Sequence, residues 1–417
     1  DLGDVESQSI LIKDAYLNKE YQKVVLLTDS LLQTSAKNYE ESYYLLNSIL
    51  LYKAKAKYEI KDYPEALDCY QKILSNTSSM EDYYLADYIY IYQSIGSCLK
   101  EEGELDKALT YYDKALTYLK KIDLNNLEPF KMGENRSMPT ILNTISNDLM
   151  NYADRNEESL VVIDVSLSLV QKMNPLPPSI AASCYYLKSK INFNLGNRDE
   201  AFLYSKKIID IIDISKANLA ILADPITVDT YYRNHAFLST VFKDYELAIK
   251  YRKVAIQHCE KYDLQLQKIV NKTALLDLES MDQNQHIDIE LYISSVQQLE
   301  SGVFKNININ KVDQLISRLS SRIAQYFMLV DDLETAKKWA EKGMRFSGDS
   351  IGSKNFSTYM LSQIYFDAGE QKEGLSLARE LTESDSQYLR KVDVLALLLK
   401  MYIRSGKNDE AKKIAKE

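Results

Sequence analysis

The most regular feature of the chain is a short pattern of polar and apolar positions that recurs along its length. A polar residue or glycine is followed within two to four residues by a small residue, and an apolar residue comes one turn later. Eight segments carry this pattern and end at Val24, Ala66, Ala108, Ala201, Ala248, Ala336, Gly374 and Ala411. The final residues of most neighbouring segments are 37 to 47 positions apart. Two longer intervals, of 93 and 88 residues, would each hold one degenerate repeat, near residues 156–160 and 288–290. A period of this length predicts a repeat array of about ten units.

Each repeat reads as a helical hairpin. A glycine or asparagine is expected to end the first helix in the left-handed conformation, and acidic residues open the second helix at its positive dipole end. Pro64 lies in such a first turn, where its missing N–H costs nothing. A second small residue stands twelve positions before the first, at Ala54, Gly96, Ser189, Ala236, Ala324 and Ser362. Paired small residues predict that the two helices of each hairpin approach closely.

The clearest unit resembles the tetratricopeptide repeat. It runs from Tyr92, Ile95 and Gly96 through Gly103 to the series Ala108, Tyr112, Ala115 and Leu116. The resemblance is strongest over residues 45–120 and looser elsewhere. It implies an all-α fold, a right-handed superhelical solenoid of about ten helical hairpins. The period exceeds the family's usual ~34 residues, which implies longer helices or longer turns.

The interruptions in the pattern predict three sub-arrays. Repeats 1–3 occupy residues 1–122, repeats 4–7 occupy 140–301, and repeats 8–10 occupy 311–417. A polar, proline-flanked insertion at 123–139 separates the first two, and a loop at 302–310 separates the last two. Residues 303–310 alternate in a way that a short strand also shows, but no partner strand is visible, so a loop is favoured.

Composition narrows the classes of function. Gly (12) and Pro (7) are scarce, which favours helices joined by short loops. The net charge is −9 with no basic stripe, so we expect no binding of nucleic acid by this segment. No apolar run approaches the ~18 residues of a membrane span. The four cysteines are scattered through helical stretches and are expected to be buried as small hydrophobic side chains.

Catalytic chemistry has no sequence support. No phosphate-binding glycine loop, nucleophile elbow or HExxH motif occurs, and the three histidines, His235, His258 and His286, lie far apart. We therefore predict no enzyme activity, no cofactor and no metal. Convergence of the three histidines in space would reopen the alternative of an enzyme.

In the family that the repeats resemble, the first helix of each hairpin lines the inner, concave surface. Tyrosine is abundant, at 32 residues, and many tyrosines fall on these helices beside lysine, arginine and amide side chains. This mixture suits an extended peptide, a protein segment or a small polar ligand, although some tyrosines could instead fill the seams between repeats. Counting from the small residues gives these candidates for the groove: Lys13, Tyr16, Lys55, Tyr58, Tyr90, Gln93, Lys100, Asn151, Tyr186, Lys190, Phe193 and Arg233.

The leading functional hypothesis is the ligand-, peptide- or protein-sensing part of a larger regulatory protein. Long-period arrays of this style resemble the sensory regions of bacterial regulators, particularly Bacteroidetes-like ones, some of which are periplasmic. The chain begins without Met and ends within a helical pattern, so a leader or an effector domain is expected beyond it. The alternative is a free-standing scaffold or chaperone adaptor. The sequence does not choose between a cytoplasmic and a periplasmic location.

Overall fold

The chain folds into helices and the turns between them. The computed structural model describes residues 2–34, 43–77, 85–121, 138–173, 177–215, 219, 222–281, 288–304, 309–348, 351–383 and 391–416, and these residues contain no strand. By its contacts the chain divides into two compact units, Asp1–Asp224 (unit 1) and Pro225–Glu417 (unit 2). We describe each unit by itself.

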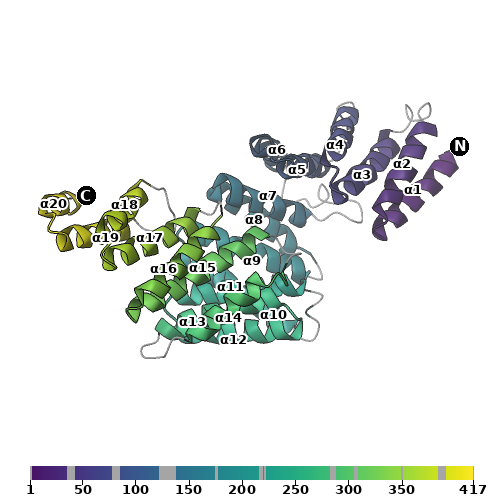
Figure 1. Cartoon of the computed structure of the whole chain (residues 1–417). Helices are drawn as coiled ribbons and strands as arrows, with labels where there is room; N and C mark the ends of the chain where they lie inside the picture. Colours follow the sequence, from purple (N-terminus) through teal and green to yellow (C-terminus); the bar gives the residue numbers. More distant parts are fainter. Residues whose placement is uncertain are drawn as a thin grey trace. The chain divides into compact units, whose positions relative to one another are not determined.

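The described residues of unit 1 form ten helices, and those of unit 2 form ten more; Figure 1 labels them. In unit 1 they are α1 (Leu2–Leu17), α2 (Tyr21–Thr34), α3 (Tyr43–Glu59), α4 (Tyr63–Thr77), α5 (Leu85–Glu101), α6 (Leu105–Leu119), α7 (Met138–Ala153), α8 (Asn156–Gln171), α9 (Pro178–Asn194) and α10 (Arg198–Ile214). In unit 2 they are α11 (Pro225–Val241), α12 (Tyr245–Lys261), α13 (Gln265–Met281), α14 (Ile289–Glu300), α15 (Ile309–Leu329), α16 (Leu333–Arg345), α17 (Ile351–Asp367), α18 (Gln371–Thr382), α19 (Lys391–Arg404) and α20 (Asn408–Ile414).

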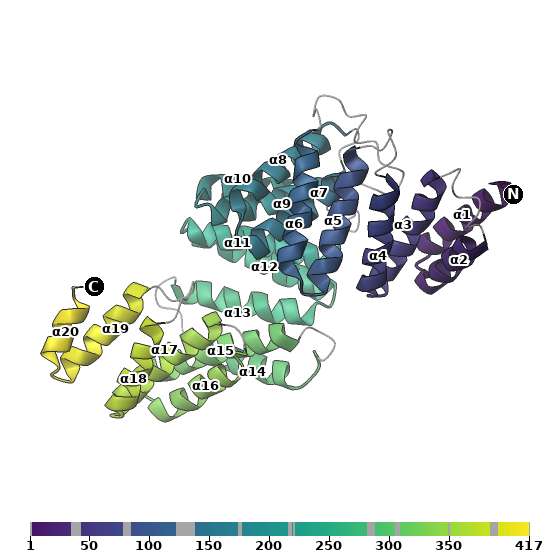
Figure 2. The ribbon, with the colours of Figure 1, turned by 90° about the horizontal axis from the view of Figure 1, so that it is seen from above.

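Nearly every odd-numbered helix packs along the even-numbered helix that follows it, and within each unit successive hairpins pack in chain order (Figure 2). The two intervals expected to hide degenerate repeats contain α8, which begins at Asn156, and α14, which begins at Ile289. The prediction of an all-α solenoid of tetratricopeptide-like hairpins is confirmed.

One hairpin departs from the rule. Helices α13 and α14 make few contacts with each other, whereas α13 packs on α12 and α14 packs on α15. The α12–α13 connection has the geometry of a hairpin turn, because Asp263 adopts a φ of 54° and Leu264 N–H donates to Cys259 O at 2.8 Å. Three helices, α11 to α13, are therefore joined by two tight turns in succession.

The hairpin turns correct one expectation from the sequence. Glycine does take the left-handed position in four hairpins, for example at Gly103 with a φ of 84°. At the equivalent place in other hairpins the residue is a lysine or an aspartate: φ is 61° at Lys19, 65° at Lys61, 59° at Lys243 and 64° at Asp331. The position of the turn was predicted, but the backbone there is strained, since a side chain disfavours this conformation.

The paired small residues lie where the two helices of a hairpin touch. Ala54, Ala66, Ala108 and Ala236 are all fully buried. In the third hairpin Gly96 leaves room for the Tyr112 ring: a Cβ at Gly96 would lie 2.8 Å from Tyr112 Cδ1 and closer still to Cε1. Close approach of helices therefore depends on the absence of side-chain volume at these positions.

The division into three sub-arrays stays a prediction. Most of the predicted insertion, residues 123–137, lies outside the described residues, while residues 138 and 139 already belong to α7. Of the predicted loop at 302–310, residues 302–304 form a turn, residues 305–308 lie outside the described residues, and α15 begins at Ile309.

Candidate ligand-binding site

The first helices of successive hairpins line a cavity within unit 2. Helices α11, α13, α15 and α17 surround a volume of about 720 Å³. Its walls carry four cationic side chains, together with apolar side chains and uncharged polar ones. The cations are Arg233, Lys311, Arg318 and Arg322, and none of the lining residues is acidic. We call this space the arginine cavity.

The same two register positions face the cavity in different hairpins. Counting back from the small residue Ala236, the positions six and three residues upstream are Thr230 and Arg233, and both line the cavity. Counting back from Ala324 in the same way gives Arg318 and Ser321, which also line it. The repeat therefore places one side of each first helix on the cavity wall.

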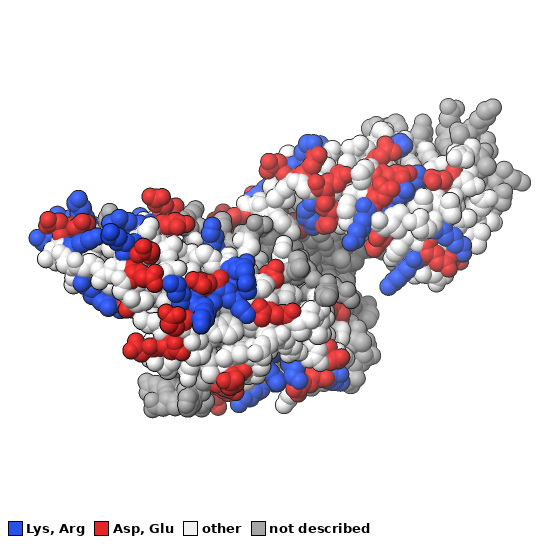
Figure 3. All heavy atoms as spheres, in the orientation of Figure 1, with Lys and Arg blue, Asp and Glu red and all other residues white. Residues whose placement is uncertain are grey.

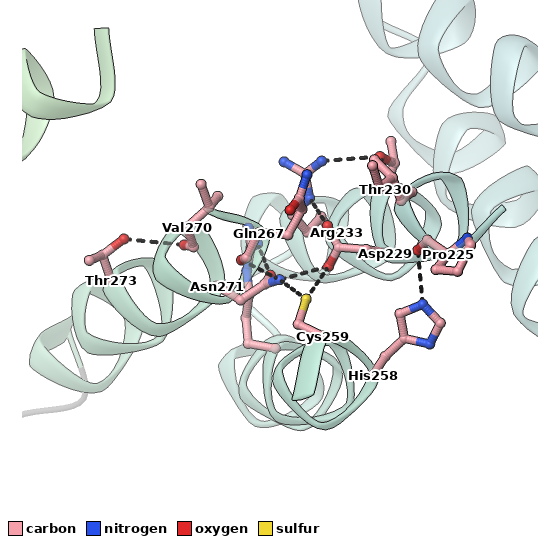
Figure 4. Close-up of polar contacts among 12 residues, drawn as sticks. Pro225, Asp229, Thr230, Arg233, His258, Cys259, Gln267, Val270, Asn271 and Thr273 are labelled. Carbon is pink, nitrogen blue, oxygen red and sulfur yellow. Dashed lines mark hydrogen bonds and ion pairs between the residues drawn. The ribbon is translucent and has the colours of Figure 1, made fainter. Parts of the chain in front are cut away.

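Behind the wall, a buried carboxylate holds Arg233 (Figure 4). Asp229 is fully buried on α11, and its Oδ2 lies 2.9 Å from Arg233 Nε. Its other oxygen accepts hydrogen bonds from Asn271 Nδ2 at 2.7 Å and from Cys259 Sγ at 3.4 Å. Asn271 Oδ1 in turn accepts a hydrogen bond from Arg252 Nη1 at 3.0 Å. Asp229 thus neutralises one arginine of the cavity and ties α11 to α12 and α13.

The remaining arginines are less well compensated. Burial lowers the pKa of Arg252 to about 10, and the charge of Arg233 adds to this effect. The pKa of Arg318 is also lowered, chiefly by desolvation, while the charge of Asp277 opposes the shift. The Arg318 side chain is exposed to solvent on the cavity wall. Arg322 Nε lies 3.5 Å from Asp277 Oδ1, an oxygen that Tyr292 OH also binds at 2.8 Å.

Positive charge is therefore in excess at this site. The cavity and its wall bring together Arg233, Arg252, Arg318 and Arg322, whereas Asp229 and Asp277 are the carboxylates that act on them. Lys311 adds a further cation on the lining. On the face of unit 2 shown in Figure 3, lysine and arginine side chains gather over α15 and α16. Such a site attracts a negatively charged ligand.

A second cavity lies within unit 1, where α1, α3, α5 and α7 meet. Its volume is about 360 Å³, and five of the groove residues predicted from the sequence line it: Tyr16, Lys55, Tyr58, Tyr90 and Gln93. We call it the tyrosine cavity. Lys55 Nζ lies 5.6 Å from the ring centre of Tyr16 and 5.7 Å from that of Tyr90, within the range of cation–π attraction. Burial raises the pKa of Tyr58 to about 12, and the negative charge of Glu101 is the next largest contribution to this shift.

The other predicted groove residues are dispersed. Lys190 lies over the Tyr186 ring at 5.7 Å, and burial lowers its pKa. Asn151 is exposed and donates to Asn147 Oδ1 at 2.9 Å. Lys13 and Phe193 are partly buried. None of these five lines either of the two cavities, and their role in binding stays a prediction.

Lys100 has a partner within the fold. Its Nζ lies 3.0 Å from Oδ2 of Asp148, a carboxylate that is 1% exposed on α7. Tyr112 OH donates to the same oxygen at 2.7 Å, and burial followed by the Asp148 charge raises the pKa of Tyr112. This network joins the third hairpin to the fourth.

The remaining chemistry-bearing side chains are packed into the helices. All four cysteines are free and buried, as the sequence predicted, and burial raises the pKa of Cys98 to about 12. His235 packs against Tyr251, and His258 Nε2 lies 2.8 Å from Pro225 O; His286 is outside the described residues. The described part of the chain shows no group of three or more metal-binding side chains. Nor does any helix there have the length and apolarity to cross a bilayer.

Helical hairpins that stack in chain order place the chain among helical-repeat proteins. Two stretches, residues 89–118 and 182–213, match the family model described as tetratricopeptide repeat. These stretches correspond to the α5–α6 and α9–α10 hairpins. Two hairpins of the chain therefore match the tetratricopeptide repeat, as the sequence resemblance implied.

Solved structures share the fold over most of the chain. The apo form of RapI has a TM-score of 0.62 at 12% identity and covers 97% of this chain and 99% of its own. NprR in complex with its cognate peptide NprX gives a TM-score of 0.50 at 13% identity, covering 81% and 89%. A STAND signal-transduction ATPase with a tetratricopeptide repeat sensor, from Pyrococcus horikoshii, gives 0.50 at 15% identity, covering 95% of this chain and 55% of that one. No relative with curated annotation matches the sequence.

Proposed function

We propose that this chain is a peptide-sensing module of a larger bacterial regulatory protein. The observation that carries the proposal is the arginine cavity. Its volume of about 720 Å³ is typical of ligand sites, which span roughly 300–1,000 Å³. Its walls carry cationic side chains on α11 and α15 and apolar side chains on all four helices, so it offers contacts both to side chains and to polar groups of a bound chain.

Two of the structures with the same fold support this reading. NprR is described as bound to its cognate peptide, and the match covers 81% of the present chain. The repeat sensor in the STAND protein belongs to a longer signalling protein, of which the present chain covers 55%. Both likenesses are of fold, so for this chain they motivate the proposal and its test.

The test of binding uses the full chain and two pairs of variants. Phe356→Ala removes an apolar wall of the arginine cavity, and Phe237→Ala makes the same change at an exposed position on α11 outside it. Tyr58→Ala acts in the tyrosine cavity, and Tyr152→Ala is its control at a 51% exposed position. Ligands captured from an extract of the source cells are identified by mass spectrometry under native and denaturing conditions.

We expect a ligand of peptide size that is lost with Phe356→Ala or Tyr58→Ala and kept with both controls. A folded protein partner lost from the same variants would favour the scaffold alternative. Equal retention by all four variants would reject both cavities as the binding site. The regulator context is tested separately: an output domain or membrane segment encoded in the same reading frame supports it, and stop codons on both sides without one contradict it.

A further inference from the structure

Three cations on α15 face the arginine cavity from one side of the helix. Lys311, Arg318 and Arg322 stand at helical spacings of seven and four residues, and all line the cavity. Like charges four residues apart on a helix repel each other and destabilise it. The ion pair of Arg322 with Asp277 accounts for one of the two arginines that stand four residues apart, but no contact within the described fold accounts for Arg318.

The carboxylates around the cavity leave one of these arginines without an ion pair. Asp229 on α11 is engaged by Arg233 at 2.9 Å. Asp277 on α13 lies 3.5 Å from Arg322 and accepts from Tyr292. Arg318 makes no ion pair or hydrogen bond with the part of the chain that the structure describes, and its side chain is exposed on the cavity wall. Its N–H donors are therefore available to a ligand that enters the cavity from solvent.

The surroundings of Arg318 define the chemistry of that ligand. A guanidinium presents a planar fork that matches a carboxylate, and Arg318 and Arg322 lie one turn apart. The walls formed by α13 and α17 include the apolar side chains of Leu266, Val270 and Phe356. A free inorganic anion would leave these walls unused. A peptide with an acidic side chain beside apolar ones uses both kinds of surface.

We propose that the arginine cavity binds an acidic side chain in the interior of an extended peptide, with Arg318 as its main anchor and Arg322 as the second. This inference rests on the proposed peptide-sensing function and names the chemical class of the peptide. Arg233 acts as a positioned wall residue, because Asp229 already neutralises it.

A random-peptide selection on the immobilised full chain tests the proposal. The peptides are displayed on phage with their C-terminus joined to the coat protein, so that none offers a terminal carboxylate. The same library is selected on wild type, on Arg318→Gln and on Lys372→Gln. Lys372 is the matched control, an exposed cation on α18 that lies outside the cavity lining.

We expect wild type and Lys372→Gln to enrich peptides with Asp or Glu next to apolar residues, and Arg318→Gln to lose that enrichment. For a synthetic peptide from the selection, Arg318→Gln should weaken binding about tenfold, the effect of one charge-assisted hydrogen bond. Asp→Asn in that peptide should weaken binding to wild type equally and have little further effect on the variant. Added salt should weaken the wild-type complex more than the variant complex.

The outcomes separate the two proposals. Enriched peptides without an acidic excess, or equal affinity of wild type and Arg318→Gln, would overturn the acidic anchor and leave peptide sensing intact. No enrichment by wild type would overturn both. Because Arg318 has no partner within the described fold, Arg318→Gln should melt at the wild-type temperature, and a lower melting temperature would assign Arg318 a structural role instead.

Discussion

Gly96 lies in the middle of α5, where alanine would ordinarily stabilise a helix. The structure predicts the opposite effect for Gly96→Ala. The added Cβ would lie 2.8 Å from Tyr112 Cδ1 and 2.9 Å from Cζ, well inside the roughly 3.5–4.0 Å of a favourable carbon–carbon contact. The Tyr112 ring is fully buried, and its hydroxyl is bound to Asp148 at 2.7 Å. The ring therefore has to move by about 1 Å against its own hydrogen bond.

The magnitude follows from three contributions. Overpacking a close-packed core costs about 1–3 kcal/mol. Weakening a hydrogen bond to a charged acceptor costs up to about 1.5–3 kcal/mol. The higher helix propensity of alanine offsets about 1 kcal/mol of this loss. We expect Gly96→Ala to destabilise the third hairpin by about 2–4 kcal/mol, the balance of these terms.

Urea unfolding of the full chain, followed by circular dichroism, measures the loss, and hydrogen exchange across α5–α7 locates it. Gly103→Ala is the matched control, because a Cβ there meets no atom within 4 Å and the cost is only that of its φ of 84°. Gly103→Ala should lower the free energy of unfolding by about 1–2 kcal/mol. Adding Tyr112→Leu to Gly96→Ala should cost less than the sum of the two single changes. A neutral or stabilising Gly96→Ala, or strict additivity with Tyr112→Leu, would refute the packing described here.

Two further predictions concern single hairpins. Lys61 is exposed and adopts a φ of 65°. Lys61→Gly should therefore raise the free energy of unfolding in urea by about 0.5–1 kcal/mol, whereas Lys61→Ala should change it little. Equal effects of the two substitutions would refute strain at this turn. Hydrogen bonds from Lys53, followed by those from Lys57, lower the pKa of Glu65 to about 2 in the folded chain. The ionised carboxylate therefore stabilises the fold fully above the unfolded pKa, near 4.5. That stability is lost as the pH falls towards 2. The Glu65 side chain is 37% exposed, so solvent screening should limit the loss of unfolding free energy to about 1 kcal/mol or less. Glu65→Gln should not show this pH-dependent loss. Parallel profiles of stability against pH for wild type and variant would contradict this assignment.

The hairpin turns show what sequence periodicity can and cannot predict. The pattern located them because the acidic residues and small residues that follow each turn are needed in every repeat. It did not predict that Lys19, Lys61 and Lys243 would adopt the left-handed conformation that glycine takes in other repeats. The packing of two helices fixes the geometry of the turn, and the cost of about 1–2 kcal/mol at one residue is small beside the burial that the packing provides.

The candidate site was predictable wherever the repeat register was applied. Counting from Gly96 gave Tyr90 and Gln93, which line the tyrosine cavity, and counting from Ala236 gave Arg233 on the arginine cavity. The same count from Ala324 gives Arg318, which was not among the predicted groove residues. Lys100 illustrates the opposite limit, since its partner Asp148 lies on the next hairpin and no local pattern reveals that contact.

The two buried acidic centres explain why the cations of the arginine cavity point to a ligand. In unit 1, Asp148 is satisfied from within, since Lys100 supplies its charge and Tyr112 its hydrogen bond. In unit 2, Arg233 supplies the charge next to Asp229, and Asn271 donates a hydrogen bond to its other oxygen. In both centres the fold itself supplies a counter-charge to a buried carboxylate. Arg318 makes no ion pair on a cavity wall that is open to solvent, so we expect the proposed ligand to supply the carboxylate.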